Sequence, residues 1–285
     1  MFDYQLLDSG DGQKFERFGE RSIVRPCKTA IWSRKLDSTR WSKADAQYEP
    51  DGGWKGRLRE DDPWSMQIGT CSMQLRLQRN GQVGIFPEHA SYLPSLTNAI
   101  EGFRKRGSVR VLNLFGYTGL ASVHCALEGA EVVHVDISRA VLEWARSNMS
   151  VNHLSTEQVR LVEEDALCYL AREARRGSRY NLILLDPPSF SRVSKSKTWS
   201  LEEIAAEIVE LVAAVADRER FFIGLAHHSL PFRTEVFENL LRDVLDVNEM
   251  DVEGHSLSVQ ETLGGRKIPA GFFVCCRTRE IEHAG

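Results

Sequence analysis

The chain has no apolar run long enough to cross a bilayer. The longest runs, such as Leu182–Leu185 and Phe221–Ala226, fall far short of the ~20 residues that a spanning helix needs. The first five residues, Met-Phe-Asp-Tyr-Gln, contain neither the basic stretch nor the apolar stretch of a secretory signal. These absences predict a cytoplasmic protein without a membrane partner.

The sequence also lacks cysteine pairs at the spacing of a metal or redox motif. Its six cysteines stand at positions 27, 71, 125, 168, 275 and 276, with no CxxC pair and no histidine at zinc-ligand spacing. A chain of 285 residues is large enough to fold around an apolar core without a disulfide framework. We therefore expect reduced thiols and no metal site.

An excess of positive charge is missing as well. The chain carries 36 Lys and Arg against 40 Asp and Glu, a net charge of −4. Coating of nucleic acid regardless of sequence, which depends on cationic charge, is therefore not expected as the main activity. The charge is uneven, however, because Lys14–Arg59 holds 12 cationic and 6 acidic residues. A local basic surface is compatible with this distribution.

Residues 1–81 are expected to form a small β-rich N-terminal domain. Turn signals alternate there with short β-prone pieces, namely Ser22–Arg25, Ala30–Ser33 and Met73–Leu77. Four of the six tryptophans lie in the same region, at positions 32, 41, 54 and 64. They form either a compact aromatic core or a basic, aromatic surface that stacks bases. The second alternative would give this domain a role in substrate recognition.

Residues 82–285 show alternating strand and helix patterns after an expected helix over 91–106. The expected strands are Val109–Leu114, Glu131–Asp136, Val159–Val162, Asn181–Asp186 and Phe221–Ala226, and the expected helices are Leu120–Glu128, Arg139–Asn152, Ala166–Arg175, 201–215 and Thr234–Val244. Two final strands, 248–260 and 271–278, follow without an intervening helix. This order predicts an α/β fold, a mostly parallel sheet covered by helices on both faces, with one antiparallel strand.

A glycine-containing loop follows the first of these strands, Asn113-Leu-Phe-Gly-Tyr-Thr-Gly119. Gly116 and Gly119 allow a tight turn, and the next helix offers N–H groups to an anionic ligand. The spacing is not GxGxxG, which disfavours a dinucleotide site. The alternative is a plain turn between strand and helix.

Carboxylates follow the next three strands, where ligands of open α/β sheets bind. Asp136, twenty residues after Gly116, can accept hydrogen bonds from ribose hydroxyls, and Asp165 can accept one from an adenine amine. Each of these carboxylates could instead cap a helix. Three carboxylates after three consecutive strands, however, are not fully explained by capping. Asp186 ends a strand, so it would lie beside the reacting group. Two prolines follow it and stiffen the backbone.

Together these motifs resemble the S-adenosylmethionine-dependent large-subunit rRNA methyltransferases. The similarity is closest to the guanine-N7 type (methyltransferase K) and more distant to the cytosine-C5 type (methyltransferase I). The residues that carry it are Asn113–Gly119, Val135–Ser138, Leu142–Ala145, Asn148, Asn152 and Leu185–Ser191, with Gly84–His89 upstream. It covers about residues 82–200 well and 200–279 loosely.

The resemblance implies a class I methyltransferase (Rossmann-like) fold, a seven-stranded sheet with a reversed last strand, and S-adenosylmethionine as the cofactor. The cofactor-binding residues that it implies are Asn113, Phe115, Gly116, Thr118, Gly119, Asp136, Ile137, Asp165, Ala166 and Asp186. The catalytic residues that it implies are Asp186, Pro187 and Pro188, which would line the methyl-acceptor site.

The residues around Asp186 indicate which atom of the acceptor receives the methyl group. Cytosine-C5 methylation needs a thiolate that adds to the ring, and no cysteine lies in the Asp186 loop or after the fifth strand. Guanine N7 carries an accessible lone pair and needs no base, which favours that acceptor. We therefore expect methylation of an rRNA base. A small-molecule or protein acceptor is the alternative, and the oligomeric state is left open.

Two further groups could contact the acceptor. His227 and His228 follow the fifth strand, and one of them could lie at the acceptor, although a packed or solvated histidine is the simpler interpretation. Arg192, Lys195 and Lys197 could contact RNA phosphates or form a solvated loop.

Overall fold

A computed structural model describes residues 3–192, 198–228, 233–245 and 250–279. The chain divides into two compact units. Unit 1 comprises Met1–Ser91 together with Leu257–Ala270, and unit 2 comprises Tyr92–Ser256 together with Gly271–Gly285. Unit 1 thus includes residues 82–91 and the tip of the last hairpin, both of which lie beyond the expected domain of residues 1–81.

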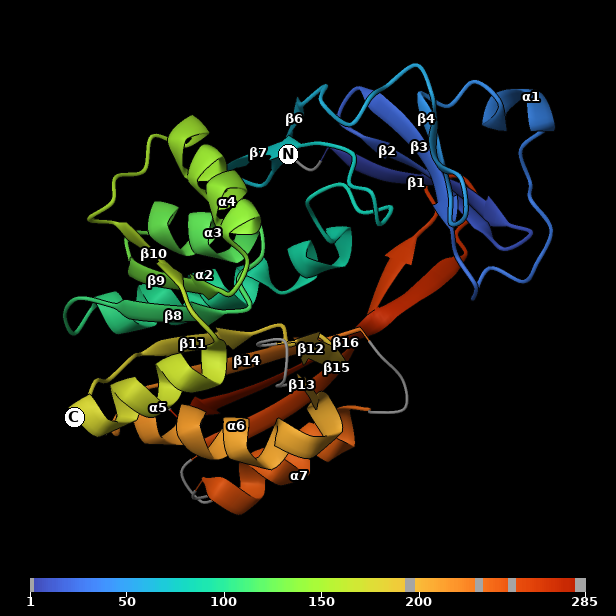
Figure 1. Cartoon of the computed structure of the whole chain (residues 1–285). Helices are drawn as coiled ribbons and strands as arrows, with labels where there is room; N and C mark the ends of the chain where they lie inside the picture. The colour runs from blue at the N-terminus through green and yellow to red at the C-terminus, as the bar shows by residue number, and fades with distance from the viewer. Residues whose placement is uncertain (1–2, 193–197, 229–232, 246–249, 280–285) are drawn as a thin grey trace. The chain divides into compact units, whose positions relative to one another are not determined.

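Unit 1 is built mainly of antiparallel strands (Figure 1). Its five-stranded sheet has the order β1-β2-β3-β4-β5, in which only the pairing of β3 with β4 is parallel. The elements are β1 (Tyr4–Gly10), β2 (Gln13–Phe18), β3 (Arg21–Pro26), α1 (Ser38–Trp41), β4 (Ala46–Glu49), β5 (Gly53–Gly56), β6 (Trp64–Ile68), β7 (Cys71–Leu75) and a 3-10 helix at Pro87–Ser91. Strands β6 and β7 form a separate hairpin.

The expected strand at Ala30–Ser33 is wrong, because this segment has no regular secondary structure. Its carbonyl groups bond instead to the turn between β1 and β2. The N–H of Asp11 donates to the Trp32 carbonyl at 2.7 Å, and the N–H of Gly12 donates to the Ala30 carbonyl at 2.9 Å. Those contacts fix the segment as an irregular loop.

The tryptophans of unit 1 divide between the two interpretations. Trp41 and Trp64 are buried, and their indole nitrogens donate to the Asp8 carboxylate and the Phe18 carbonyl. Trp41 packs against Phe15 at 5.4 Å between ring centroids. Because both tryptophans are buried, neither can stack on a base. Trp32 and Trp54 are only partly buried.

Unit 2 contains a seven-stranded sheet of order β10-β9-β8-β11-β14-β16-β15 in the described part of the chain. Its elements are α2 (Leu93–Arg104), β8 (Arg110–Leu114), α3 (Leu120–Leu127), β9 (Glu131–Asp136), α4 (Arg139–Val151), β10 (Val159–Glu163), α5 (Ala166–Arg176), β11 (Leu182–Leu185), β12 (Phe190–Arg192), β13 (Thr198–Ser200), α6 (Leu201–Val215), β14 (Phe222–His227), α7 (Thr234–Val244), β15 (Met250–Gln260) and β16 (Lys267–Thr278). Strands β8 to β11 and β14 pair in parallel, and β16 is antiparallel to β14. The expected α/β fold with its reversed strand is confirmed.

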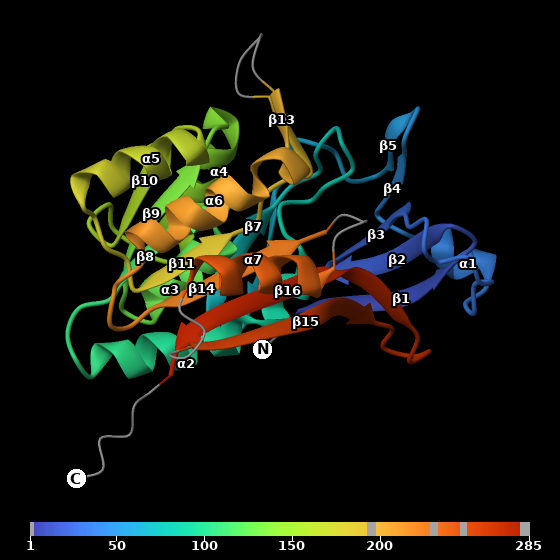
Figure 2. The same ribbon diagram turned by 90° about the horizontal axis from the view of Figure 1, so that it is seen from below.

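Helices cover both faces of this sheet. Helices α2, α3 and α4 lie on one face and α5, α6 and α7 on the other, as the two views show (Figures 1 and 2). Helix α6 begins with a capping box between Ser200 and Glu203. Its apolar side chains pack into the core, where Leu201, Ile208 and Val212 are buried. The parallel strands are thus apolar on both faces, and their carboxyl ends lie at one edge of the sheet.

Candidate active site

The loops after β8, β9, β10 and β11 lie side by side because the strands are in parallel register. Leu114 pairs with Val135 and with Leu185, and Asp136 pairs with Glu163. The structure therefore brings the predicted residues of these four loops to one edge of the sheet. Asn113, Thr118, Gly119, Asp165, Ala166 and Pro187 are buried, Phe115, Gly116, Asp136 and Asp186 are half-buried, and Ile137 and Pro188 are exposed.

The loop 115–119 has an uncommon backbone conformation. Phe115 and Tyr117 adopt left-handed conformations with φ of 55° and 50°, which cost side chains other than glycine ~1–2 kcal/mol each. The Gly116 N–H donates to the Val135 carbonyl at 3.1 Å. The amide of Asn148 on α4 donates to the Thr118 carbonyl at 2.8 Å. These contacts hold the loop across the end of β9 and point to a function for its strained backbone.

Asp136 is bonded to the same loop. Its carboxylate accepts the Tyr117 N–H at 3.1 Å and the Ser138 N–H at 2.9 Å. Burial raises the pKa of Asp136, and the backbone hydrogen bonds oppose that rise. Beside it, Ile137 is 42% exposed and offers an apolar surface to a flat ring. A partly exposed carboxylate and an adjacent apolar side chain suit the hydroxyls and the base of a nucleoside.

Asp165 caps α5, because its side chain accepts the Cys168 N–H at 3.0 Å. This is the structural role that the sequence left open beside adenine recognition, and one carboxylate can serve both because it has several acceptor lone pairs. Ser138 occupies the N-cap position of α4 without a side-chain capping bond. The Asp136 carboxylate accepts the Ser138 N–H.

Asn113 faces the interior rather than the loop surface. Its amide donates to Ser122 Oγ at 2.8 Å, and Ser122 Oγ lies 2.9 Å from His134 Nδ1. The His134 ring is fully buried beneath Gly116. Asn113 therefore supports the loop through Ser122 and His134, a buried polar chain that sequence reasoning missed.

His134 should make stability depend on pH. Burial lowers its pKa from 6.5 to about 4, so below pH 6.5 the unfolded chain takes up a proton that the folded protein does not. Stability is then lost as pH falls from 6.5 towards 4, by ~1.4 kcal/mol per pH unit and ~3 kcal/mol in all. We expect His134→Gln to flatten this part of the profile in urea unfolding from pH 7 to 4.5. If the free energy of unfolding has the same slope against pH in parent and variant, His134 is not the group responsible.

The Asp186 loop lies next to the end of β14. Asp186 Oδ1 is 3.4 Å from His228 Nε2, and the Pro187 carbonyl is 3.3 Å from His227 Nδ1. His227 is buried among aromatic rings, and burial lowers its pKa. His228 and Asp186 are both partly exposed. The packed interpretation thus holds for His227, whereas His228 reaches the acceptor loop.

A short hairpin continues from this loop. Strands β12 and β13 pair with Ser191 opposite Trp199, so Phe190 and Trp199 are expected on opposite faces. Trp199 is buried, with its ring 6.0 Å from that of Phe115 and its indole nitrogen unpartnered within the described residues. Phe190 is 60% exposed. Sequence reasoning missed Trp199. Lys195 and Lys197 lie outside the described residues.

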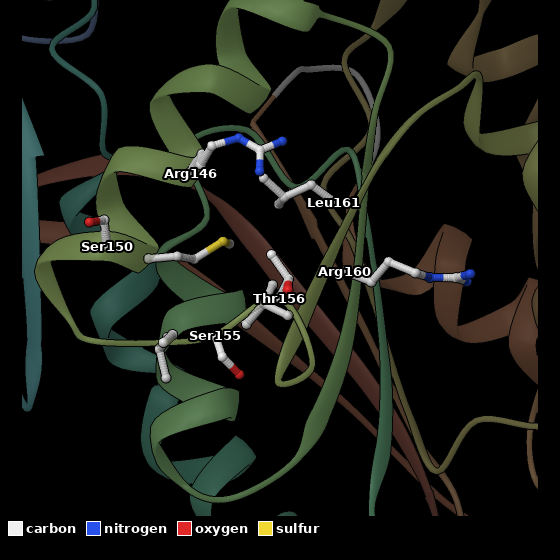
Figure 3. A pocket seen from close by; sticks show the side chains of 9 residues that line it. Arg146, Ser150, Ser155, Thr156, Arg160 and Leu161 are labelled. Atoms are coloured by element: carbon white, nitrogen blue, oxygen red, sulfur yellow. The ribbon is translucent and has the colours of Figure 1, made fainter.

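A separate cavity of about 280 Å³ lies between α4 and β10 (Figure 3). It is lined by Arg146, Met149 and Ser150 of α4, by Leu154, Ser155 and Thr156, and by Val159, Arg160 and Leu161 of β10. The lining residues of β10 lie before the carboxyl end of that strand. The loops described above begin at the carboxyl ends of β8, β9, β10 and β11. The predicted cofactor residues do not line this cavity.

The sheet order, the strained loop 115–119 and the carboxylate of Asp136 at the end of β9 define a class I methyltransferase. Residues 23–217 match the family model described as "S-adenosylmethionine-dependent methyltransferase". The chain belongs to this family, and its cofactor is S-adenosylmethionine.

Comparisons with individual proteins agree. A solved SAM-dependent methyltransferase from Agrobacterium tumefaciens is 31% identical, with a TM-score of 0.90 over 96% of this chain and 90% of that one. Proteins named "Ribosomal RNA large subunit methyltransferase K/L" are similar too. The one from Syntrophotalea carbinolica is 37% identical over 75% of this chain, and the one from Cellvibrio japonicus is 30% identical over 82%. The matches span 28% and 27% of those longer proteins.

No helix among the described residues is long and apolar enough to span a membrane. The expectation that no metal takes part stays a prediction.

Proposed function

We propose that this enzyme methylates a base of ribosomal RNA. The observation that carries the proposal is the exposed Phe190 in the loop that begins at Asp186. An exposed aromatic ring suits a base that has left its stack, because every base offers a flat face. The similarity to proteins named for large-subunit rRNA supports the same class of acceptor.

We propose a set of cofactor contacts that the resemblance implies and the loop geometry supports. Asp136 would hold the ribose hydroxyls, Ile137 and Ala166 with Asp165 would contact adenine, and Phe115 to Gly119 would hold the methionine part. S-adenosylmethionine supplies a methyl group on a positively charged sulfur. The protein's own contribution is to place the acceptor in line with that methyl group, which proximity and orientation achieve.

Asp186, Pro187 and Pro188 are proposed to position the acceptor. The two prolines restrict the backbone, and the contact between His227 and the Pro187 carbonyl supports the turn. Asp186 keeps a partly exposed carboxylate beside His228, where it can accept a hydrogen bond from an amino or imino group of a base.

The two adjacent thiols of β16 support an acceptor with its own lone pair, such as guanine N7. Cys275 and Cys276 are buried in β16, and burial raises their pKa values to about 11 and about 12. Both are protonated at neutral pH, so neither is suited to add to a cytosine ring. This favours N7 methylation over C5 methylation.

A labelled methyl group should identify the acceptor. The full chain would be incubated with methyl-labelled S-adenosylmethionine and, separately, deproteinised large-subunit rRNA, transfer RNA, soluble protein or a small-molecule extract. We expect label in rRNA, recovered as 7-methylguanosine after digestion to nucleosides. Label confined to protein or small molecules would overturn the proposal. Label in 5-methylcytidine would keep RNA as the acceptor and reject N7.

Phe190→Ser tests the stacking contact. Base stacking on an aromatic ring is worth ~1–3 kcal/mol, so kcat/KM for RNA should fall by ~5- to 150-fold while cofactor affinity stays unchanged. Val236→Ser, which changes another exposed apolar side chain on α7, is the matched control and should leave both quantities near the parent values. An unchanged kcat/KM in Phe190→Ser would remove Phe190 from the acceptor site.

A further inference from the structure

The segment between β3 and β4 has an excess of cationic over acidic residues. We call residues 28–43 the basic loop. It holds five cationic residues, Lys28, Arg34, Lys35, Arg40 and Lys43, and one acidic residue, Asp37. All of these cations except the half-buried Arg34 are exposed.

The charge of unit 1 depends on this loop. Unit 1 holds 16 Lys and Arg and 14 Asp and Glu, and without residues 28–43 it holds 11 and 13. Unit 2 holds 20 and 26 and would repel a polyanion. The basic loop therefore accounts for the net positive charge of unit 1, which favours contact with a polyanion.

The loop has little regular structure, yet it is firmly held. The buried Asp8 carboxylate accepts the N–H groups of Lys35 and Leu36 at 3.0 and 2.8 Å and the Trp41 indole N–H at 3.0 Å. Arg266 completes the set, 2.8 Å from Asp8. A loop fixed in this way loses little conformational entropy when it binds a partner.

Within the described residues, Lys28, Arg40 and Lys43 form no ion pair, whereas Arg34 lies 3.5 Å from Asp11. Lys35 donates to the Gly264 carbonyl. Asp37 caps α1 through the Thr39 and Arg40 N–H groups. Lys28, Arg40 and Lys43 are thus exposed on a fixed backbone without an ion pair in the described part of the chain, and Arg40 also helps to lower the pKa of the neighbouring Asp37.

An apolar surface accompanies these charges. Ile31 is 87% exposed, and the neighbouring Trp32 is partly exposed. The Trp32 indole is fixed by a 3.0 Å bond to the Ser9 carbonyl and by Arg266 at 5.6 Å from its ring. Cations beside an apolar or aromatic surface are the features that bind single-stranded nucleic acid.

We propose that the basic loop binds the phosphates of RNA through Lys28, Arg40 and Lys43, with Ile31 and Trp32 against a base. This proposal rests on the proposed function, because it assumes that RNA is the acceptor. It assigns binding to unit 1, separately from methyl transfer at the strand ends of unit 2.

The test compares two triple variants of the full chain with equal loss of charge. Lys28→Gln/Arg40→Gln/Lys43→Gln changes the basic loop, and Arg17→Gln/Arg59→Gln/Arg79→Gln changes exposed cations of unit 1 outside it. Binding of large-subunit rRNA fragments would be measured by fluorescence anisotropy across a salt series. For single strands, the slope of log K against log salt is ~0.7 per neutralised phosphate.

We expect the loop variant to reduce that slope by ~2 and to weaken binding at least ~10-fold at low salt. The control variant should change both much less. Ile31→Ser should weaken binding without changing the slope. Cofactor affinity should stay at the parent value in every variant, which reports that unit 2 is intact.

Different outcomes separate the two proposals. Equal weakening in both triple variants, or none in the loop variant, overturns the assignment of the basic loop even if the parent methylates rRNA. A parent chain that neither binds nor methylates rRNA overturns the proposed function, and the loop assignment with it.

Discussion

Replacement of Asp136 by asparagine is expected to weaken binding of S-adenosylmethionine by about 100-fold or more. The substitution removes the charge and turns one of two acceptor oxygens into a donor, while the Tyr117 and Ser138 N–H groups still require acceptors. Each hydrogen bond to a charged group is worth ~1.5–3 kcal/mol, and ~1.4 kcal/mol is a tenfold change in affinity. Isothermal titration calorimetry would measure the loss.

The pH dependence of binding provides an internal check on this prediction. Burial raises the pKa of Asp136, so the parent should lose affinity as pH falls towards that raised value and the carboxylate takes up a proton. The variant should lack this loss. The matched control is Glu163→Gln, which changes an exposed carboxylate at the end of the next strand. This variant should bind the cofactor like the parent. Equal affinity of parent and folded Asp136→Asn would refute the placement of the ribose.

Gly116→Ala is expected to have the other large effect. A Cβ atom at this position would lie 2.4 Å from Cε1 and 2.5 Å from Nδ1 of His134. The ring cannot easily move because it is fully buried and its Nδ1 lies 2.9 Å from Ser122 Oγ. Overpacking of this kind costs ~1–3 kcal/mol. We expect that loss in urea unfolding, together with a cofactor affinity at least ~10-fold below the parent value.

A second substitution separates steric from backbone causes. The backbone of Gly116 is not left-handed, so its intolerance of a side chain comes from the ring. Gly116→Ala/His134→Ala should therefore be less destabilised than the sum of its single variants, with a coupling of ~0.5–3 kcal/mol. Gly119→Ala serves as the control because Gly119 has φ of 91°, and His134→Ala should not relieve it. Additive effects at Gly116 and His134 would show that the contact is not the cause.

Unit 2 could be predicted from the sequence because its strands are short apolar runs and its helices carry periodic apolar stripes. The predicted residues after four strands come together for a general reason, since parallel strands end at one edge. The buried chain from Asn113 to His134 could not be predicted. It depends on a register between β8 and β9 that places Asn113 opposite His134, and no local pattern encodes that pairing.

Unit 1 was harder to predict for a related reason. Strand β2, Gln-Lys-Phe-Glu-Arg-Phe, buries the charged Glu16 as well as its aromatic rings. Glu16 is acceptable there because Arg25 of β3 lies 2.8 Å away, Lys14 lies 3.1 Å away and the Tyr4 hydroxyl donates to it. Arg25 and Tyr4 belong to neighbouring strands, so local periodicity does not reveal them. Ala30–Ser33 has β-prone residues, yet contacts with the β1–β2 turn hold it as a loop. The contact of His228 with Asp186 likewise joins loops from separate strands.

Unit 1 combines an early and a late segment of the chain, which has a consequence for folding during synthesis. Its first segment leaves the ribosome long before residues 257–270, which contribute Glu261 and Arg266. Until those residues are synthesised, Asp8 lacks the guanidinium 2.8 Å away, and Ser9 lacks the Glu261 carboxylate to which it donates. A buried carboxylate without its cation is unfavourable. The contacts of Asp8 and Ser9 with residues 261 and 266 can therefore form only after almost the whole chain has been translated.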